Sequence, residues 1–460
     1  MLHFKSKEWY IGDVHPYYHD NKLYLFYLKP NGIIRCDACF EDPTKVVCGN
    51  SVVAISENYV DFEEYLLDIP VVNIVEKDGI YYTNVSDVQG TMESRDLLHW
   101  KTSEHFKFKA DLKVFPAGTR DHAFFYDEDQ EGMRVTMLAY ETNEHNGFGA
   151  GIDCCVGISD VIPYDGDGMV AQRGLFPINN QGVDLMCSRE PECNQMLKIG
   201  KRWYLLTSLA RQTVHWVGPL SYWIGNENTP IDQDDFRHKK EYRLDGEDLS
   251  AAQIAPNGER YYKFGWIPMN YNGQEWGGHL NFPHEVYQLE DGRLACRLDP
   301  AFARSIVKNE KSHDIFWGKY IAEFGRCVCI QSTSEFGLRA CIDLRNSEKS
   351  GLILDMEKGI GVEIERKMNS MRVVCKKVEG IFCYAQLELD SDVWSDIAII
   401  HAIYDEDIIE VFLNDKYTLC ARTEVKNHKN VVGVFSDREI RWIRSYELKR
   451  PDKKYHLMEE

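Results

Sequence analysis

One short pattern recurs along the first two thirds of the chain: a turn rich in Asn, Asp or Gly, followed by an aromatic-rich strand. Its five copies are HDNKLYLFYL from His19, EKDGIYYTNV from Glu76, DEDQEGMRVTMLAY from Asp127, LKIGKRWYLLTS from Leu197 and APNGERYYKFGW from Ala255. Their spacing of roughly 50 to 70 residues leaves room for one four-stranded antiparallel sheet per copy. One small sheet cannot bury both of its faces alone, so the repeat predicts a five-bladed β-propeller over residues 1–305. The alternative is a string of unrelated hairpins.

The sequence pattern changes after Phe302. Short alternating strands separated by regular turns follow, among them RCVCIQS, GLILDM, GVEIER, MRVVCKK and NVVGVFS. This alternation predicts a C-terminal β-sandwich over residues 306–460, with the polar stretch VKNEKSHD as a linker and a supporting or accessory binding role. Long stretches of helical period are missing, so the whole chain is predicted to be all-β.

Composition narrows the classes of protein. The 460-residue chain has a net charge of −20, which argues against a nucleic-acid partner because phosphate binding needs clustered Lys and Arg. No run approaches the roughly 20 apolar residues that cross a bilayer, and no apolar leader follows the first lysines, so we expect a cytoplasmic protein without membrane contact. Among the 14 cysteines only Cys36 and Cys39 form a CxxC pair, and without a second such pair or a His/Cys ligand spacing we expect reduced thiols and no metal.

Three acidic residues stand just before or at the first strand of separate repeats: Asp13 in WYIGDVHPYY, Asp121 in GTRDHAFFY and Glu192 in REPECNQMLKIG. We expect them at the same point of their sheets, and therefore together at one end of the axis. A single carboxylate is usually a solvated turn residue, but three at equivalent positions indicate a site. Paired carboxylates suit glycoside hydrolysis, in which one attacks or activates water at the anomeric carbon and the other protonates the leaving oxygen.

The string SRDLLHW at 94–100 resembles the SxDLxHW string of glycoside hydrolase family 32, the invertase, inulinase and levanase family. WYIGDVHPYYHDNKLYLFYLKP is similar to the family's opening WMNDPNG segment and the strand after it. TRDHAFF resembles the RDP motif, and ECNQMLKIGKRWYLLTS resembles the ECP motif. DLSAAQ, FGWIPM, WGGHLNFPHEV, EDGRLACRL and IIEVFLND match later family segments in order. Each motif is short, but their common order over nearly the whole chain makes the resemblance specific.

Carried over residue by residue, the resemblance implies that Asp13 is the nucleophile and Glu192 the general acid/base. Asp121 would stabilise the transition state by binding sugar hydroxyls beside Arg120. The nucleophile must stay ionised and the acid must keep its proton, which the negative charge of Asp13 and Asp121 favours in Glu192. Arg120 is expected to hold Asp121 ionised and to donate a fork of hydrogen bonds.

Departures from the family pattern surround this predicted site and spare the three acids. They are Gly12 in place of Asn, Val14-His15-Pro16 in place of Pro-Asn, His122 in place of Pro, Asn194-Gln195 in place of Pro-Asp, and Gln89 in place of Trp. As candidate substrate-binding residues, His15 and His122 either replace the lost donors or fill space. Trp9 is either a wall of the sugar pocket or a core residue, and Glu190 is a rival acid that the Glu192-Cys193 match disfavours.

The resemblance implies a retaining, exo-acting β-fructofuranosidase that needs no cofactor. Its substrate would be a small fructoside such as sucrose, a fructo-oligosaccharide or a fructose disaccharide. Three alternatives stay open: a related five-bladed hydrolase of arabinofuranosides or xylosides, a fructosyl transferase, and a catalytically inactive carbohydrate-binding homologue. The sequence also leaves open whether the chain forms a homo-oligomer.

Overall fold

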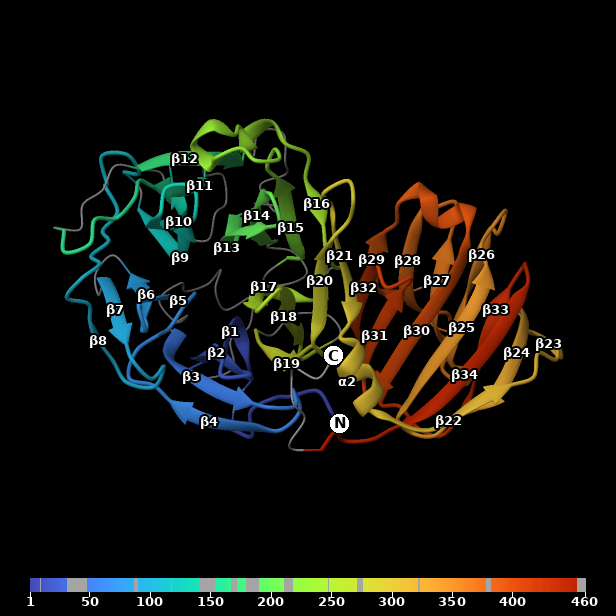
Figure 1. Ribbon diagram of the computed structural model, residues 1–460. Coiled ribbons are helices and arrows are strands. Elements are labelled where there is room, and N and C mark those ends of the chain that lie inside the picture. The colour runs from blue at the N-terminus through green and yellow to red at the C-terminus, as the bar shows by residue number, and fades with distance from the viewer. Residues whose placement is uncertain are drawn as a thin grey trace.

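The computed structural model describes all residues except 9, 31–47, 87–89, 117, 141–153, 167–171, 179–189, 211–217, 247, 271–275, 322, 378–381 and 453–460. Strands make up most of the described part, and α2 (Pro300–Ser305) is a short helix between its two halves (Figure 1). The prediction of an all-β chain is confirmed. Among the described residues, no helix has the length and apolar character to cross a membrane.

The first half of the chain folds into consecutive antiparallel sheets, numbered here in chain order. Sheet 1 contains β1 (Gly12–His19), β2 (Lys22–Pro30), β3 (Cys48–Ser56) and β4 (Phe62–Leu66). Sheet 2 contains β5 (Val75–Lys77), β6 (Ile80–Ser86), β7 (Gly90–Ser94) and β8 (Trp100–Thr102). Sheet 3 contains β9 (Thr119–Asp127), β10 (Gly132–Tyr140), β11 (Cys154–Ser159) and β12 (Gln172–Ile178).

Two further sheets complete this half. Sheet 4 contains β13 (Glu190–Ile199), β14 (Arg202–Ala210), β15 (Leu220–Ile224) and β16 (Tyr242–Arg243). Sheet 5 contains β17 (Ser250–Asn257), β18 (Arg260–Pro268), β19 (Gly278–Leu280), β20 (His284–Gln288) and β21 (Leu294–Leu298). In Figure 1 the sheets surround a common centre, and the first strand of each sheet lies innermost. Every hairpin that the sequence predicts is present and joins the first two strands of one sheet.

Apolar clusters fill the spaces between neighbouring sheets. Phe26 of sheet 1 packs with Tyr81 of sheet 2, and further clusters join sheet 2 to sheet 3, sheet 3 to sheet 4, and sheet 4 to sheet 5. Sheet 5 also packs against sheet 1, where Phe264 and Trp266 share a cluster with Leu25. Packing therefore closes the circle of sheets without a strand shared between them, and it turns the first strands towards one centre.

The second half forms two larger antiparallel sheets that share one apolar core. One is ordered β22 (Val307–His313), β34 (Ile440–Leu448), β25 (Phe336–Asp343), β30 (Ile397–Asp405), β31 (Ile408–Leu413) and β32 (Tyr417–Arg422). The other is ordered β23 (Lys319–Ile321), β24 (Gly325–Gln331), β33 (Val431–Ser436), β26 (Lys349–Asp355), β27 (Ile360–Glu365), β28 (Ser370–Cys375) and β29 (Phe382–Glu388). Leu338 and Ile400 of the first sheet lie in the same core as Leu352 and Val373 of the second.

The prediction that VKNEKSHD is a linker is wrong. Residues 307–313 form β22, which pairs with β34 at the edge of the second half. Its side chains are mostly exposed, which explains the polar sequence: an edge strand with little buried surface reads like a loop.

The SRDLLHW string forms the tight turn between β7 and β8. The Asp96 carboxylate accepts hydrogen bonds from the backbone N–H groups of Leu98 at 2.9 Å and His99 at 2.8 Å. Leu97 is fully buried with a φ of 65°, and the Trp100 indole donates to its carbonyl at 3.2 Å. The role of this string within the described structure is to shape a turn.

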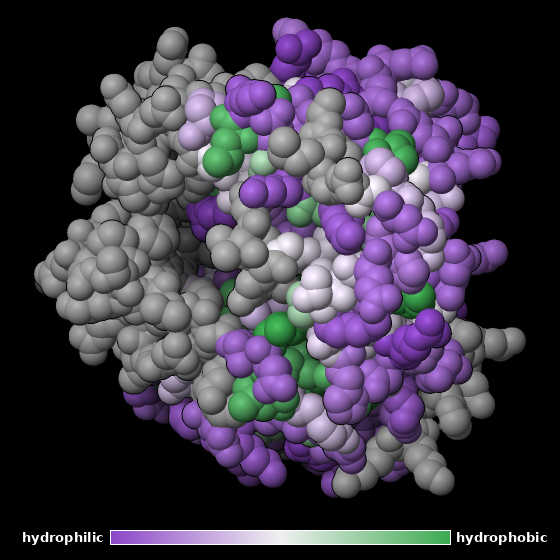
Figure 2. Space-filling view, turned by 90° about the vertical axis from the view of Figure 1, so that its left-hand side faces the viewer, coloured by the Kyte–Doolittle hydropathy of each residue, from purple (hydrophilic) through white to green (hydrophobic). Residues whose placement is uncertain are grey.

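The molecular face in Figure 2 is mainly hydrophilic where it is coloured. Apolar side chains gather there in small, separate groups, and the surface is hollowed near the centre of the view. This face therefore presents no broad apolar patch among the residues that the figure colours.

Candidate active site

A β-bulge recurs in the innermost strands. In β1 two residues, Asp13 and Val14, stand opposite one residue of β2. The same extra residue occurs at Asp121–His122 in β9, at Cys193–Asn194 in β13 and at Ala251–Ala252 in β17. Bulges redirect side chains and are common next to active sites, so their repetition around one centre marks this end of the circle.

The first residue of each bulge has a left-handed backbone. The φ angles are 46° at Asp13, 54° at Asp121, 50° at Cys193 and 46° at Ala251. Asn73, two residues before β5, also has a left-handed backbone, with a φ of 39°. Residues with a Cβ seldom adopt this conformation, so the surrounding contacts must hold the backbone at all of these places.

The prediction of equivalent positions holds for Asp13 and Asp121, which both begin a bulge. It is wrong for Glu192, which lies one residue before the bulge of β13. Glu192 therefore corresponds to Arg120 of sheet 3, whereas Cys193 corresponds to the two aspartates. Glu192 therefore stands at a different position of its strand from the two aspartates, and its carboxylate contacts Arg120.

Hydrogen bonds and charges nevertheless bring the three acids together. The Cys193 N–H donates to Asp121 Oδ2 at 3.2 Å, and Asn194 Nδ2 donates to the Asp121 carbonyl at 3.2 Å. Arg120 Nη2 donates to Glu192 Oε1 at 2.5 Å. The charges of Asp121 and Arg120 also act on the Asp13 carboxyl. Sheets 1, 3 and 4 thus meet at one cluster of carboxyl groups.

Asp13 lies beside the buried indole of Trp266. Its Oδ1 atom is buried and makes no hydrogen bond within the part of the chain that the structure describes. Trp276 packs so closely on Gly12 that a Cβ there would lie 2.4 Å from the indole, which explains the glycine before the aspartate. Burial and the charge of Asp121 raise the pKa of Asp13 to about 7, although Arg120 and Trp266 oppose the rise.

The charges of the free protein differ from those expected of a retaining site. Arg120, predicted to hold Asp121 ionised, forms an ion pair with Glu192. Asp13, predicted to be ionised, has a pKa near neutrality.

The raised pKa of Asp13 predicts the acid side of the pH profile. The family resemblance implies that Asp13 is the nucleophile, which must be ionised to react. On that assignment kcat/KM for a fructoside is expected to fall about tenfold per pH unit below about pH 7. An Asp with an ordinary pKa would place this limb near pH 4. Initial rates at low substrate concentration across this range decide the matter, and a flat profile down to about pH 5 would contradict the burial of Asp13 in the active protein.

The two candidate histidines are buried and serve contacts between sheets. His122 is 2% exposed, and its ring nitrogens lie 2.9 Å from Asn84 Oδ1 of sheet 2 and 2.9 Å from Thr119 Oγ1. His15 is 5% exposed, and its Nδ1 lies 2.9 Å from Gln253 Oε1 of sheet 5. Burial lowers the pKa of His15 to about 4, so this imidazole is neutral at physiological pH.

Some predicted residues lie outside the described part of the structure. Trp9 and Gln89 are among them, and so is the side chain of the rival acid Glu190. Trp266 and Trp276 are described, at 0% and 5% exposure, and they pack against each other with ring centroids 6.0 Å apart. They wall the Asp13 side of the cluster.

Sequence reasoning missed Cys193, Gln253 and Asn73 as members of this cluster. The number of residues between each bulge and the hairpin turn after it could have identified Cys193. Asp13 precedes the left-handed turn residue Asp20 by the same seven positions that separate Cys193 from Gly200 and Ala251 from Gly258. Counting back from these turns, instead of matching acids, places Cys193 at the position equivalent to Asp13.

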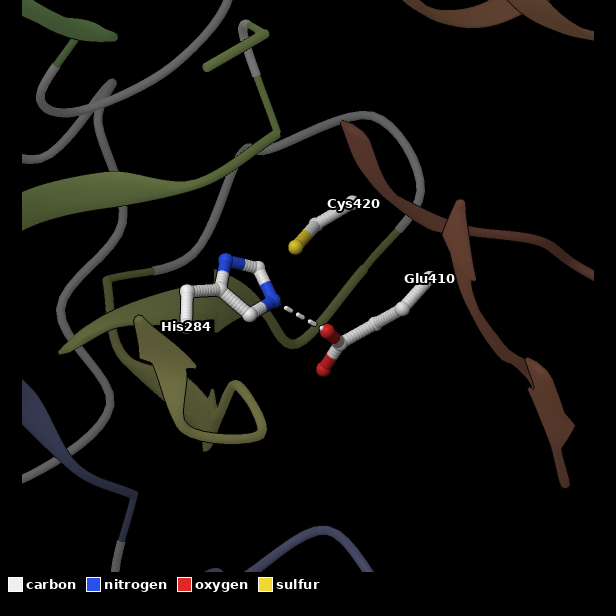
Figure 3. Close-up of side chains that lie close together, drawn as sticks. All are labelled: His284, Glu410 and Cys420. Carbon is white, nitrogen blue, oxygen red and sulfur yellow. Dashed lines mark hydrogen bonds and ion pairs between the residues drawn. The ribbon is translucent and has the colours of Figure 1, made fainter. Parts of the chain in front are cut away.

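A second polar cluster lies between the two halves of the molecule (Figure 3). His284, Glu410 and Cys420 are buried there with potential metal-ligand atoms within 4.8 Å of one another. The Glu410 carboxylate already accepts from His284 Nε2 at 2.5 Å, His3 Nε2 at 2.8 Å and the Phe282 N–H at 2.7 Å. These three donors satisfy both oxygens, so a hydrogen-bonded ion cluster explains the arrangement.

Comparison with known proteins gives the class of fold. No protein-family model matches this chain, and no curated protein sequence matches it either. Solved structures of glycoside hydrolases do match over nearly the whole length. Exo-inulinase from Aspergillus awamori is 14% identical with a TM-score of 0.65, and the match covers 98% of each chain.

Two further structures give the same result. Sucrose-6-phosphate hydrolase from Lactobacillus gasseri is 14% identical with a TM-score of 0.65, covering 100% of this chain and 94% of that one. Fructan 1-exohydrolase IIa from Cichorium intybus is 12% identical with a TM-score of 0.68, covering 98% and 97%. The chain therefore has the fold of the glycoside hydrolase family 32 structures.

Proposed function

We propose that this protein is a retaining glycoside hydrolase that releases fructose from small β-fructofuranosides. In this proposal residues 1–305 are a five-bladed β-propeller whose blades are sheets 1 to 5, and residues 306–460 are a β-sandwich. The observation that carries the proposal is the meeting of Asp13, Asp121 and Glu192 at the centre of a fold whose solved relatives include fructan and sucrose-phosphate hydrolases. The substrate class rests on those relatives.

The proposed roles follow from the chemistry of retention. Asp13 attacks the anomeric carbon while Glu192 protonates the leaving oxygen, and a water activated by Glu192 then releases the sugar from Asp13. Retention requires a separation of about 5–5.5 Å between the two carboxyl groups. Asp121, whose Oδ2 is oriented by the Cys193 N–H, accepts hydrogen bonds from sugar hydroxyls.

Arg120 links binding to protonation in this scheme. Before the reaction, Glu192 must leave its ion pair and hold a proton, and Asp13 must lose one. A sugar that fills the cluster supplies hydroxyl oxygens as new acceptors for the Arg120 guanidinium. Asp13 then loses its proton to solvent, as it does above about pH 7, and Glu192 holds one once the guanidinium has left it.

A second candidate function, binding of a fructoside without turnover, is favoured by the same observation. The Arg120–Glu192 pair and the pKa of Asp13 near 7 describe a resting site that is not yet arranged for catalysis. If the sugar does not open this pair, the site binds carbohydrate and does not cleave it. Arabinofuranosides, xylosides and fructosyl transfer remain alternatives within the enzyme class.

Incubation of the wild-type protein with sucrose, short fructo-oligosaccharides, and aryl arabinofuranosides and xylosides tests the proposal. We expect fructose from the first two groups and no pentose. Glu192→Gln is expected to slow hydrolysis by about 10²–10⁴-fold, because it removes general acid catalysis. Glu259→Gln, at an exposed turn of sheet 5, is the matched control and should retain wild-type rates. Binding of fructoside by calorimetry with no product would establish the binding function instead.

A further inference from the structure

His15 follows the Asp13 bulge directly and points away from solvent. The acceptor on its Nδ1 side is the amide oxygen Oε1 of Gln253 at 2.9 Å, so Nδ1 carries the proton and donates. The Asn73 side chain makes a further polar contact with the imidazole. His15 therefore connects the strand of Asp13 in sheet 1 to the innermost strand of sheet 5 and to Asn73, two residues before β5 of sheet 2.

Gln253 continues this connection to the other acids. It is 1% exposed, and its Nε2 donates to the Cys193 carbonyl at 3.5 Å. The N–H of Cys193 donates to Asp121 Oδ2, and Cys193 directly follows Glu192 in β13. One chain of hydrogen bonds thus runs from the strand of the nucleophile, through His15 and Gln253, to the segment that carries the acid/base and to the stabilising aspartate.

We propose that His15 is a positioning residue that, together with Gln253, fixes the Asp13 carboxyl relative to Glu192 and Asp121. This inference rests on the proposed function and assigns the histidine to the geometry of the site instead of to sugar contact. A left-handed residue such as Asp13 needs outside contacts to stay in place, and the bond from His15 is anchored two residues further along the same strand. A fixed separation of the carboxyl groups is what retention demands.

The charge state of His15 suits this role. Burial lowers the pKa of the imidazole, and its neutral form adds no charge to a cluster that already holds Asp13, Asp121, Glu192 and Arg120. A neutral amide can therefore replace it. Asn carries an N–H donor near the place of Nδ1, so His15→Asn preserves the bond to Gln253, whereas His15→Ala removes it.

Steady-state kinetics of the full-length variants on the best fructoside tests the inference. His15→Ala and Gln253→Leu are each expected to lower kcat by about 10²-fold with little change in KM, because a displaced nucleophile binds sugar but reacts poorly. Their effects should not add in the double variant. His15→Asn should restore most of kcat, and the acid limb of the pH profile should move in His15→Ala but not in His15→Asn. His238→Ala, at an 82% exposed histidine, is the control.

The outcomes separate this inference from the proposed function. Unchanged kcat in folded His15→Ala, or fully additive losses in the double variant, would overturn the positioning role. If the wild-type protein turns over no fructoside, the proposed function fails, and crystal structures of wild type and His15→Ala then decide the inference. A shift of the Asp13 carboxyl in the variant supports it, and an unmoved carboxyl overturns it.

Discussion

Replacing Asp13 with Asn is expected to lower fructoside turnover by at least about 10⁴-fold, measured as kcat with a sensitive fructose assay. Asn has the shape of Asp but cannot form the covalent bond to the anomeric carbon. Asp121 begins the corresponding bulge of sheet 3, where its Oδ2 is held by the Cys193 N–H. Asp121 should therefore not replace Asp13 as the nucleophile in this variant.

The folded state of this variant should be intact. The pKa of Asp13 is raised in the folded protein, so this group binds its proton more tightly when folded, and its contribution to stability falls as pH rises from about 4 to about 7. A neutral Asn removes that cost, and the thermal midpoint at neutral pH should equal or exceed that of wild type. Asp20→Asn, at an 81% exposed turn in the same hairpin, is the matched control and should keep full activity. Retained turnover in Asp13→Asn would remove Asp13 as nucleophile.

Replacing Glu410 with Gln is expected to lower the free energy of unfolding by about 3–5 kcal/mol, because it removes one partner of a buried ion cluster. Glu410 is fully buried and accepts hydrogen bonds from His3 and His284. Burial lowers the pKa of His3, but Asp405 and Glu410 outweigh this effect, and the pKa is raised overall. In the variant, His3 keeps Asp405 alone as its carboxylate partner at this site.

Chemical unfolding of wild type and variant at several pH values measures this loss. The folded-state pKa of His3 is raised, so its stabilising contribution is present below about pH 6.5 and is lost as pH rises through the raised value. The difference between the two proteins should therefore shrink at alkaline pH. Glu388→Gln, at an exposed position of β29, should stay within about 0.5 kcal/mol of wild type. An equally small effect of Glu410→Gln would show that the cluster does not hold the two halves together.

Much of the architecture is readable from local sequence. Each predicted hairpin combines a turn such as Asp20-Asn21 or Asp78-Gly79, whose residues adopt left-handed φ, with an aromatic strand, and both signals act over only a few residues. The error at 307–313 has a local cause as well. A solvent-exposed edge strand buries little and lacks the alternation that marks a strand.

The site was only partly predictable. Short motifs located the segments of Asp13, Asp121 and Glu192, but matching by residue type hid the fact that Cys193, not Glu192, shares the bulge position. The partner of Arg120 could not be predicted from the sequence either. Arg120 is adjacent to Asp121 in the chain, but its guanidinium forms an ion pair with Glu192 of sheet 4. The cluster of His3, Glu410 and His284 joins residues more than 100 positions apart, which no local pattern records.

Covalent trapping tests the central claim most directly. Glu192→Gln is incubated with a fructosyl donor that has a good leaving group, so that the sugar is transferred to the protein but water is not activated to release it. Peptide mass spectrometry then locates the attached sugar. The proposed function predicts one fructosyl group on the peptide that contains Asp13, and none when Asp13→Asn is added. A fructosyl group on another carboxylate, or fructose released with inverted configuration and no labelled peptide, would contradict it.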